Sequence, residues 1–527
     1  MKHTNRLRRG VSMRRGGFKS CTGWRKGRIG SRDGSQSRSP LVSFHHLAPS
    51  CAVWRRFRRV QLDPRMSKVQ VLAPRDFSLL QRPDSPLDDL PDACNDPIFP
   101  GLPPLYHGHP DLHLRNGVLA AHSSAHPDAE QAFFVADLSQ VYAQHLRWRA
   151  CLPEVHPFYA VKCNPDPYVL RLLAALGTGF DCASNGEISQ VLSIGNVHPD
   201  RIIFANPCKA VSFVRNAANM RVDTMTFDNS DELYKIARAH PRARLVLRIL
   251  TDDSKALCQL GIKFGAPLAA VPALLAKARE LALDVVGISF HVGSGNYDPT
   301  VYTDAVRRAR AVFDMGADAG YTFSLLDVGG GFEDALFEQA AVYLKDAIDM
   351  YFPDRSQIKI IAEPGRFYVS KAFSLATNII ARRAPLDPPL GDPPPTAEQP
   401  AVMYYINDGV YGAFNCILFD HQVVQPFVLS MGGSFHVAPD EPLHTSSVWG
   451  PTCDSIDCVC PTAQLPRALR VGDWLGFHNM GAYTVCAASQ FNGFQVSNVV
   501  YTTGNFKPSE LRSVLANFAA DIENVDV

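Results

Sequence analysis

The stretch PFYAVKCNPDPYVLRLLAALGTGFDCAS (residues 157–184) decides the fold. A strand-like apolar run at 157–162 is followed by a segment with helical spacing of apolar residues at 168–176, and a second strand-like run begins at 179. Two short apolar runs separated by one helix are typical of a βαβ unit with buried, parallel strands. The sequence therefore predicts an α/β architecture.

The alternation continues for eight strand-like runs. They lie at residues 157–162, 179–184, 202–206, 224–228, 244–250, 285–293, 325–331 and 359–363. Eight repeats in about 210 residues match a (β/α)8 barrel, which typically contains about 250 residues. A doubly wound sheet could also hold eight strands, but no GxGxxG sequence opens a helix after the first strand. We therefore predict a TIM-like barrel over residues 139–370.

The pattern changes on both sides of the barrel. Beyond residue 370, apolar and polar residues alternate between turn signals, which is typical of a mostly antiparallel β domain. We assign residues 371–527 to this domain, with a proline-rich surface loop at 384–400. We expect residues 66–138 to be an N-terminal segment that contributes to the same domain.

The N-terminus is strongly basic. Residues 1–60 contain 16 of the 52 lysines and arginines but one acidic residue, Asp33. Residues 1–65 lack sustained periodicity, so we expect a disordered basic extension. A mitochondrial transit peptide, or translated sequence upstream of a start at Met66, is an alternative interpretation.

The rest of the chain is acidic, with 36 basic and 50 acidic residues. This balance argues against nucleic-acid binding, and no apolar run approaches the ~18 residues of a membrane helix. Cys453, Cys458 and Cys460 lack paired CxxC spacing, so no metal site is expected. We expect a cytoplasmic protein.

Reactive side chains follow the predicted strands, at the end where barrel enzymes carry their active sites. Lys162 ends the first strand and is a candidate Schiff-base lysine, the alternative being a structural ion pair. The glycine triplet 329–331 ends the seventh strand, where backbone N–H groups can bind phosphate. Glu363 and Arg366 follow the eighth strand and suit a pyridine nitrogen and a phosphate. Together these groups predict pyridoxal 5'-phosphate (PLP) as cofactor.

The sixth strand ends in HVGSG (291–295). A lone histidine is more often structural than functional. The position of His291 at a strand end, beside a Gly/Ser turn, favours stacking on the cofactor ring or contact with its phosphate.

From about residue 75 onward the chain resembles the family of eukaryotic ornithine decarboxylases, which belong to the fold-type III (alanine-racemase-like) PLP-dependent enzymes. The matching stretches are PFYAVKCN (157–164), FDCASNGEI (180–188), FANPCK (204–209), VLRILTDDSKALC (246–258), ISFHVGSG (288–295), LDVGGGF (326–332), IAEPGRFYV (361–369), YYINDGVYGAFNCILFDH (404–421), WGPTCDSID (449–457) and NMGAYT (479–484). The segment FEDALFEQAAVYLKD (332–346) departs from the family because it is shorter.

The resemblance implies a role for each matching residue. Lys162 would bind PLP covalently, Glu363 would pair with its ring nitrogen, and His291 would stack on the ring. The residues implied to hold the phosphate, or to lie near the cofactor, are Ser294, Gly330, Gly331, Arg366, Tyr483, Asp181 and Arg248.

The resemblance also implies how substrate is bound. Cys453 would donate the proton to the α-carbon, while Asp420 and Asp454 would bind the distal ammonium of the substrate. Because the family builds its sites across a dimer interface, Cys453 and Asp454 would serve the partner subunit's Lys162.

The implied activity is decarboxylation of L-ornithine to putrescine, the first step of polyamine biosynthesis. Antizyme inhibitors share this fold but have lost cofactor-site residues and act only by binding antizyme, so binding of antizyme without catalysis is one alternative. The presence of Lys162, Asp181, Asp420, Cys453 and Tyr483 argues against it. A preference for lysine, arginine or diaminopimelate is another, although the last would need an arginine near Asp454.

Overall fold

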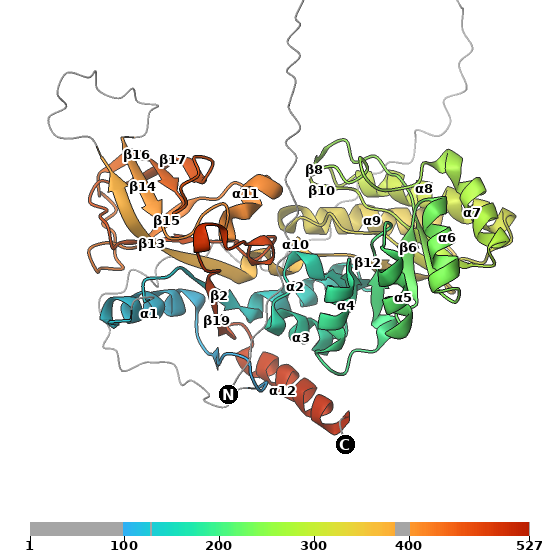
Figure 1. The fold of residues 1–527 in the computed structure, drawn as a ribbon, viewed down its shortest axis with the longest axis horizontal. Coiled ribbons are helices and arrows are strands. Elements are labelled where there is room, and N and C mark those ends of the chain that lie inside the picture. The colour runs from blue at the N-terminus through green and yellow to red at the C-terminus, as the bar shows by residue number, and fades with distance from the viewer. Residues whose placement is uncertain (1–97, 127–128, 385–400, 526–527) are drawn as a thin grey trace, which may run out of the picture. The chain divides into compact units, whose positions relative to one another are not determined.

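The computed structural model describes residues 98–126, 129–384 and 401–525. The basic extension 1–65 and nearly all of the predicted loop 384–400 lie outside these residues. Eight parallel strands close a barrel in the order β11-β12-β3-β4-β5-β6-β7-β9 (Figure 1), which confirms the predicted fold class. The barrel strands are β3 (Val155–Ala160), β4 (Gly179–Cys182), β5 (Ile202–Phe204), β6 (Thr224–Phe227), β7 (Arg244–Arg248), β9 (Asp284–Ser289), β11 (Leu325–Asp327) and β12 (Lys359–Ala362).

Helices follow the barrel strands, as the βαβ pattern predicts. They are α3 (Pro167–Ala175), α4 (Asn185–Leu192), α5 (Val211–Asn219), α6 (Ser230–Ala239), α7 (Val271–Glu280), α8 (Val301–Asp318), α9 (Phe337–Tyr351) and the short α10 (Arg366–Val369), while α2 (Leu138–Cys151) precedes β3. Asp166, Ser184 and Asn229 begin three of them by accepting backbone N–H groups of the first turn. None of the helices described is long and apolar enough to cross a membrane.

The interior of the barrel is filled by side chains from six of its strands. One buried cluster consists of Phe158, Ile203, Val246, Val286, Leu325 and Ile361. A filled interior leaves the loops at the C-terminal ends of the strands as the place where a site can form.

The predicted strands run too far at their C-terminal ends. The predicted strands reach Lys162, Gly293 and Gly331, whereas β3, β9 and β11 end at Ala160, Ser289 and Asp327. Lys162 lies instead in a 3-10 turn, η3 (Val161–Cys163). Strand pairing stops where the backbone turns into the loops, so the polar residues after it are free to face the barrel mouth.

A short two-stranded antiparallel sheet was not predicted. β8 (Ala256–Cys258) pairs with β10 (Ser294–Asn296) at the ends of two barrel loops. Each strand has three residues, and β10 reads SGN, which carries no strand pattern.

A nine-stranded sheet forms the second domain, with the order β1-β19-β2-β13-β14-β16-β17 and a branch through β18 and β15. Its strands are β1 (Leu105–Tyr106), β2 (Phe133–Asp137), β13 (Phe373–Arg383), β14 (Val402–Ile406), β15 (Pro426–Ser430), β16 (Leu443–Trp449), β17 (Cys458–Pro466), β18 (Trp474–Phe477) and β19 (Asn498–Thr502). Five of its eight pairings are antiparallel. Three helices belong to the same part of the chain: α1 (Pro110–Ser123), α11 (Cys416–Phe419) and α12 (Pro508–Val525).

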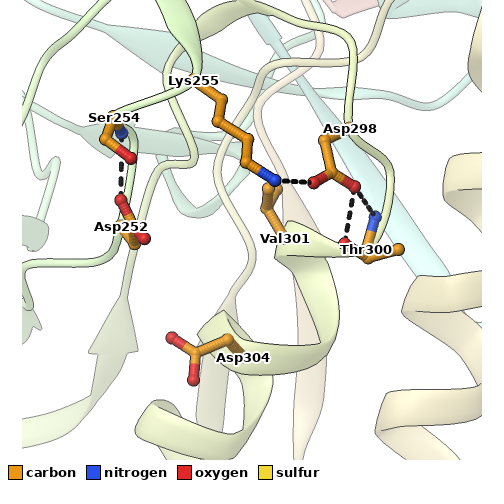
Figure 2. Close-up of a pocket in the computed structure, with 7 residues that line it drawn as sticks. All are labelled: Asp252, Ser254, Lys255, Asp298, Thr300, Val301 and Asp304. Atoms are coloured by element: carbon orange, nitrogen blue, oxygen red, sulfur yellow. Dashed lines mark hydrogen bonds and ion pairs between the residues drawn. The ribbon is translucent and has the colours of Figure 1, made fainter.

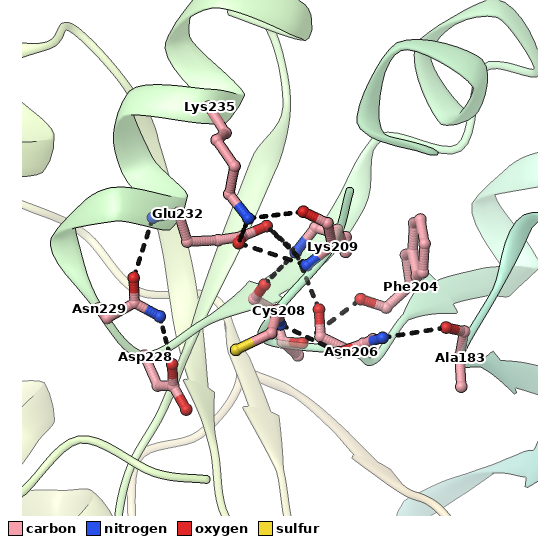
Figure 3. Close-up of polar contacts among 10 residues, drawn as sticks. Ala183, Phe204, Asn206, Cys208, Lys209, Asp228, Asn229, Glu232 and Lys235 are labelled. Atoms are coloured by element: carbon pink, nitrogen blue, oxygen red, sulfur yellow. Dashed lines mark hydrogen bonds and ion pairs between the residues drawn. The ribbon is translucent and has the colours of Figure 1, made fainter. Parts of the chain in front are cut away.

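A buried lysine ties the barrel together next to β5 and β6 (Figure 3). The Lys209 side chain is fully buried, and its Nζ lies 2.9 Å from Glu232 Oε1 in α6. It also donates to the carbonyl oxygens of Asn206 (3.0 Å) and Thr226 (2.6 Å). Burial lowers the pKa of Lys209, and Glu232 opposes this shift. With all three ammonium protons bound, Lys209 is a structural residue.

We expect Lys209→Met to destabilise the fold by about 3 kcal/mol, because removing one partner of a buried ion pair leaves the other charge poorly compensated. Lys235, 2.5 Å from Glu232, keeps the loss at the lower end of the range. Lys345→Met, which removes an exposed pair with Asp349 on α9, should cost under about 0.5 kcal/mol. Urea unfolding measures both variants, and equal effects would contradict the structural role.

Candidate active site

Lys162 and Asp181 form the centre of the barrel mouth. Asp181 is the last-but-one residue of β4, is fully buried and accepts a hydrogen bond from Lys162 Nζ. The lysine side chain remains 45% accessible. Burial disfavours its charged form, but the negative charge of Asp181 outweighs this and raises the pKa of Lys162. The lysine is thus an accessible amine that Asp181 holds in place.

Two further acids lie at the same mouth. Burial, followed by the charge of Asp327, raises the pKa of Glu363 well above its ordinary value, while burial raises the pKa of Asp327 to about 7. Two neighbouring carboxyl groups repel each other when both are charged, which favours keeping a proton on the pair. Such a pair can hold a hydrogen bond to a pyridine nitrogen.

Gly330 and Gly331 form a loop, here called the glycine cradle, that has no room for side chains. A Cβ at Gly330 would lie 2.8 Å from both Glu363 O and His291 Nε2, and one at Gly331 would lie 2.5 Å from Gly293 O. Gly331 also has a φ of +92°, which favours glycine. The loop therefore packs too closely on its neighbours for side chains here, and Gly330 and Gly331 can offer only backbone N–H groups to a phosphate, next to the side chain of Ser294.

His291 has a defined orientation. Its Nδ1 accepts the backbone N–H of Gly293 at 3.0 Å, so the neutral ring carries its proton on Nε2. Burial, followed by the charges of Arg248 and Lys162, lowers the pKa of His291 well below its ordinary value. Arg248 ends β7 and packs over the Phe264 ring, with 5.2 Å from its Cζ to the ring centroid. His291 is therefore a neutral ring suited to stacking.

Arg366 meets an acid that the sequence assigned to the substrate. Its guanidinium pairs with Asp420, a buried residue just after α11, and lies over the Tyr483 ring with Cζ 5.3 Å from the centroid. Burial disfavours the charge, but Asp420 raises the pKa of Arg366. A substrate ammonium would have to share this carboxylate with Arg366 or replace it there.

Tyr483 and its neighbours connect the β domain to the residues that follow Lys162. Its backbone N–H donates to Cys163 O at 2.9 Å, and Asn164 Nδ2 donates to Gly481 O at the same distance. Tyr483 has a φ of +55°, a strained conformation for a non-glycine residue. Burial raises the pKa of its hydroxyl, so the ring stays neutral beside Arg366.

Cys453 and Asp454 make their hydrogen bonds to other residues. Cys453 is exposed, and its backbone N–H donates to Asn492 Oδ1 at 3.2 Å. Asp454 accepts the Tyr411 hydroxyl at 2.5 Å. Within the described ranges, no hydrogen bond or ion pair joins either residue to Lys162 or Glu363. A single chain thus brings together the predicted cofactor residues but not the predicted proton donor.

Three buried polar atoms show that the mouth fits PLP. Asp181 Oδ1, Asp327 Oδ2 and Arg366 Nε have no hydrogen-bond partner among the described residues. Buried polar atoms without partners are costly unless a ligand pairs with them. A lysine, an acidic pair, a glycine cradle and an arginine match the amine, ring nitrogen and phosphate contacts that PLP needs.

Another hollow, of about 170 Å³, lies between the loop after β7 and the start of α8 (Figure 2). Its lining residues are Asp252, Ser254, Lys255, Asp298, Thr300, Val301 and Asp304. Lys255 Nζ lies 2.5 Å from Asp298, which also accepts from Thr300. These charges satisfy one another, and none of the predicted site residues lines the hollow.

Sequence reasoning missed two acids of the mouth, Asp327 and Glu333. Asp327 is flanked by apolar residues at the end of β11, one residue before the glycine triplet begins, and Asp181 likewise lies between apolar and sulfur-containing neighbours near the end of β4. That shared position was the available signal. Glu333 lies in the shortened segment 332–346 and carries no signal of its own.

Comparison with known proteins agrees with this geometry. Residues 138–370 match the family model described as pyridoxal-dependent decarboxylase, pyridoxal binding domain. The chain is 54% identical over 377 residues to the ornithine decarboxylase of Schizosaccharomyces pombe, covering 71% of this chain and 84% of that protein. It is 53% identical over 375 residues to antizyme inhibitor 2 of Xenopus laevis, covering 70% and 80%.

Among solved structures, the arginine decarboxylase of Paramecium bursaria Chlorella virus superposes with a TM-score of 0.68 at 35% identity, covering 74% of this chain and all of that one. Relatives of this similarity, matched over most of their length, establish the family. The chain belongs to the ornithine decarboxylase family of pyridoxal-dependent decarboxylases.

Proposed function

We propose that this protein decarboxylates L-ornithine to putrescine, the first step of polyamine biosynthesis, with PLP as cofactor. The observation that carries the proposal is the set of Lys162, Asp181 and Glu363 at one barrel mouth. Bound PLP withdraws electrons from the bond that breaks when CO2 leaves. The similarity to the Schizosaccharomyces pombe ornithine decarboxylase supports ornithine as the substrate.

The residues of the mouth divide the remaining work. Lys162 Nζ must lose a proton before it can act as a nucleophile, and Asp181 Oδ2 is its hydrogen-bonded acceptor. The proton held by Glu363 and Asp327 is available to the cofactor's ring nitrogen. Arg366 would hold the phosphate through its guanidinium, which matches that anion's geometry.

Substrate choice rests on two carboxylates, Asp420 and Asp454. A distal ammonium loses its hydration on entering a site, and carboxylates offset that loss. Cys453, next to Asp454, carries the thiol that would protonate the α-carbon.

A homodimer would complete the site. Among the described residues, Cys453 and Asp454 make their hydrogen bonds to Asn492 and Tyr411 and none to Lys162, and a second chain would supply them to the site. Large apolar side chains are exposed in and near the segments that carry Asp420, Asp454 and Asn492, namely Phe419 (71%), Ile456 (52%) and Phe491 (42%). Exposed apolar residues of this kind mark surfaces that bind another protein. A two-fold interface would place Cys453 and Asp454 beside the partner subunit's Lys162.

The similarity to antizyme inhibitor 2 raises a second candidate function, binding of antizyme without catalysis. Purified protein incubated with PLP distinguishes the two. A decarboxylase acquires the visible absorbance of lysine-bound PLP and releases CO2 from ornithine, whereas a binding protein of that kind does neither. Binding of antizyme by the active enzyme is compatible with the first outcome.

We propose a cytoplasmic location, with the basic extension 1–65 dispensable for catalysis. Every residue assigned to the site lies beyond residue 160. A chain beginning at Met66 should therefore match the full chain in activity and melting temperature. Loss of activity in the shortened chain, or import into mitochondria of a fluorescent protein fused to residues 1–65, would contradict this.

A further inference from the structure

Glu333 lies among the groups assigned to the cofactor's phosphate. Its Oε1 accepts the backbone N–H of Gly295 at 3.0 Å and lies 3.6 Å from Arg366 Nε. The side chains of Glu333 and Arg366 are only 13% and 10% exposed. A carboxylate of the protein therefore already accepts one hydrogen bond and makes one ion pair of the kind that bind phosphate.

The charge of Arg366 only partly offsets the cost of burying the Glu333 carboxylate. Burial raises the pKa of Glu333, while the charge of Arg366 and the hydrogen bond from Gly295 oppose the shift. Arg366 Nε is buried and has no hydrogen-bond partner among the described residues, since Glu333 is too far away to be one. The Glu333 carboxylate thus lies at the proposed phosphate site without a hydrogen bond to Arg366 Nε.

The chain holds Glu333 there through its neighbour. Asp334 begins the short 3-10 helix η6 (Asp334–Leu336) and pairs with Arg147 at 2.7 Å and Lys371 at 2.6 Å. These ion pairs anchor the backbone directly after Glu333. The shortened segment 332–346 therefore places an acid at the cradle and fixes it by two cations outside the cradle.

We propose that Glu333 is a built-in competitor for the phosphate of PLP. Its carboxylate binds Gly295 N–H and Arg366 in the cofactor-free protein, and it must move away or be neutralised when a phosphate binds. A carboxylate and a phosphate that compete for the same donors repel each other. Glu333 therefore weakens binding of phosphate-bearing ligands and stabilises the cofactor-free form. The inference rests on the proposed use of PLP and adds a determinant of how tightly the cofactor is held.

Equilibrium binding to the cofactor-free protein tests this. Glu333→Gln keeps the side chain's size and its acceptor oxygen but removes the charge. We expect the dissociation constant for PLP, measured by absorbance titration, to fall at least about tenfold. Inorganic phosphate should raise the melting temperature of the variant at lower concentration than in the wild type. The affinity for pyridoxal, which lacks the phosphate, should not change.

Two further variants sharpen the result. Glu280→Gln removes an acid that pairs with Lys277 on α7, away from the cradle, and should leave PLP affinity unchanged. Glu333→Asp keeps the charge but shortens its reach, so an affinity between wild type and Glu333→Gln is expected. Unchanged or weaker PLP binding by Glu333→Gln, or an equal gain for pyridoxal, would overturn the proposal. Failure of the wild type to bind PLP would instead refute the proposed function on which the inference rests.

Discussion

Replacing Lys162 with alanine should abolish both decarboxylation and the visible absorbance of bound PLP. Covalent attachment needs a nucleophilic amine at this position, and Lys162 is the amine that Asp181 holds at the barrel mouth. Activity should fall below detection in a radiometric CO2 assay. Absorbance spectra of the purified variant with added PLP should lack the band of the lysine-bound cofactor.

Lys255→Ala is the matched control, because it removes an exposed lysine of the hollow in Figure 2, whose ion pair among the described residues is with Asp298. It should keep wild-type absorbance and turnover. Near-normal turnover by the Lys162→Ala protein, with folding verified by its melting temperature, would refute the assignment of the cofactor lysine.

Mixing two inactive proteins, Lys162→Ala and Cys453→Ala, should restore about a quarter of the wild-type activity. If subunits exchange freely, about half of the dimers are hybrids, and each hybrid has one site with both wild-type residues. The structure motivates this test, because one chain leaves Cys453 exposed and hydrogen-bonded to Asn492.

Lys162→Ala mixed with Glu363→Gln provides the control. These residues belong to the same mouth of one chain, so every hybrid site would lack one of them and activity should not return. Recovery in this control, or none in the Cys453 mixture when subunit exchange is verified by mass spectrometry, would contradict sites shared in this way.

The barrel could be predicted because its strands are short apolar runs that end in polar residues. That pattern is sufficient to place Lys162, Glu363 and the glycine triplet at the C-terminal ends of barrel strands. It placed the strand ends too late, since apolar residues such as Val161 and Val292 continue past the last paired residue.

Contacts between distant residues could not be predicted in the same way. Arg366 and Asp420 are 54 residues apart, and their pairing depends on how the β domain packs on the barrel. The position of Glu333 depends on the ion pairs of Asp334, which join three separate elements. The spacing of residues along the chain does not encode such contacts. The contacts of Asp420 and Glu333 with Arg366 are therefore evident only in the structure.

Competition among substrates tests whether the protein is a decarboxylase that prefers L-ornithine. Purified protein with PLP would receive equal concentrations of L-ornithine, L-lysine and L-arginine in one vessel, and the amine products would be separated and quantified over time. We expect putrescine to be the main product, with cadaverine and agmatine as minor products. Cadaverine or agmatine in excess of putrescine would contradict ornithine as the substrate, and no amine at all would contradict decarboxylation itself.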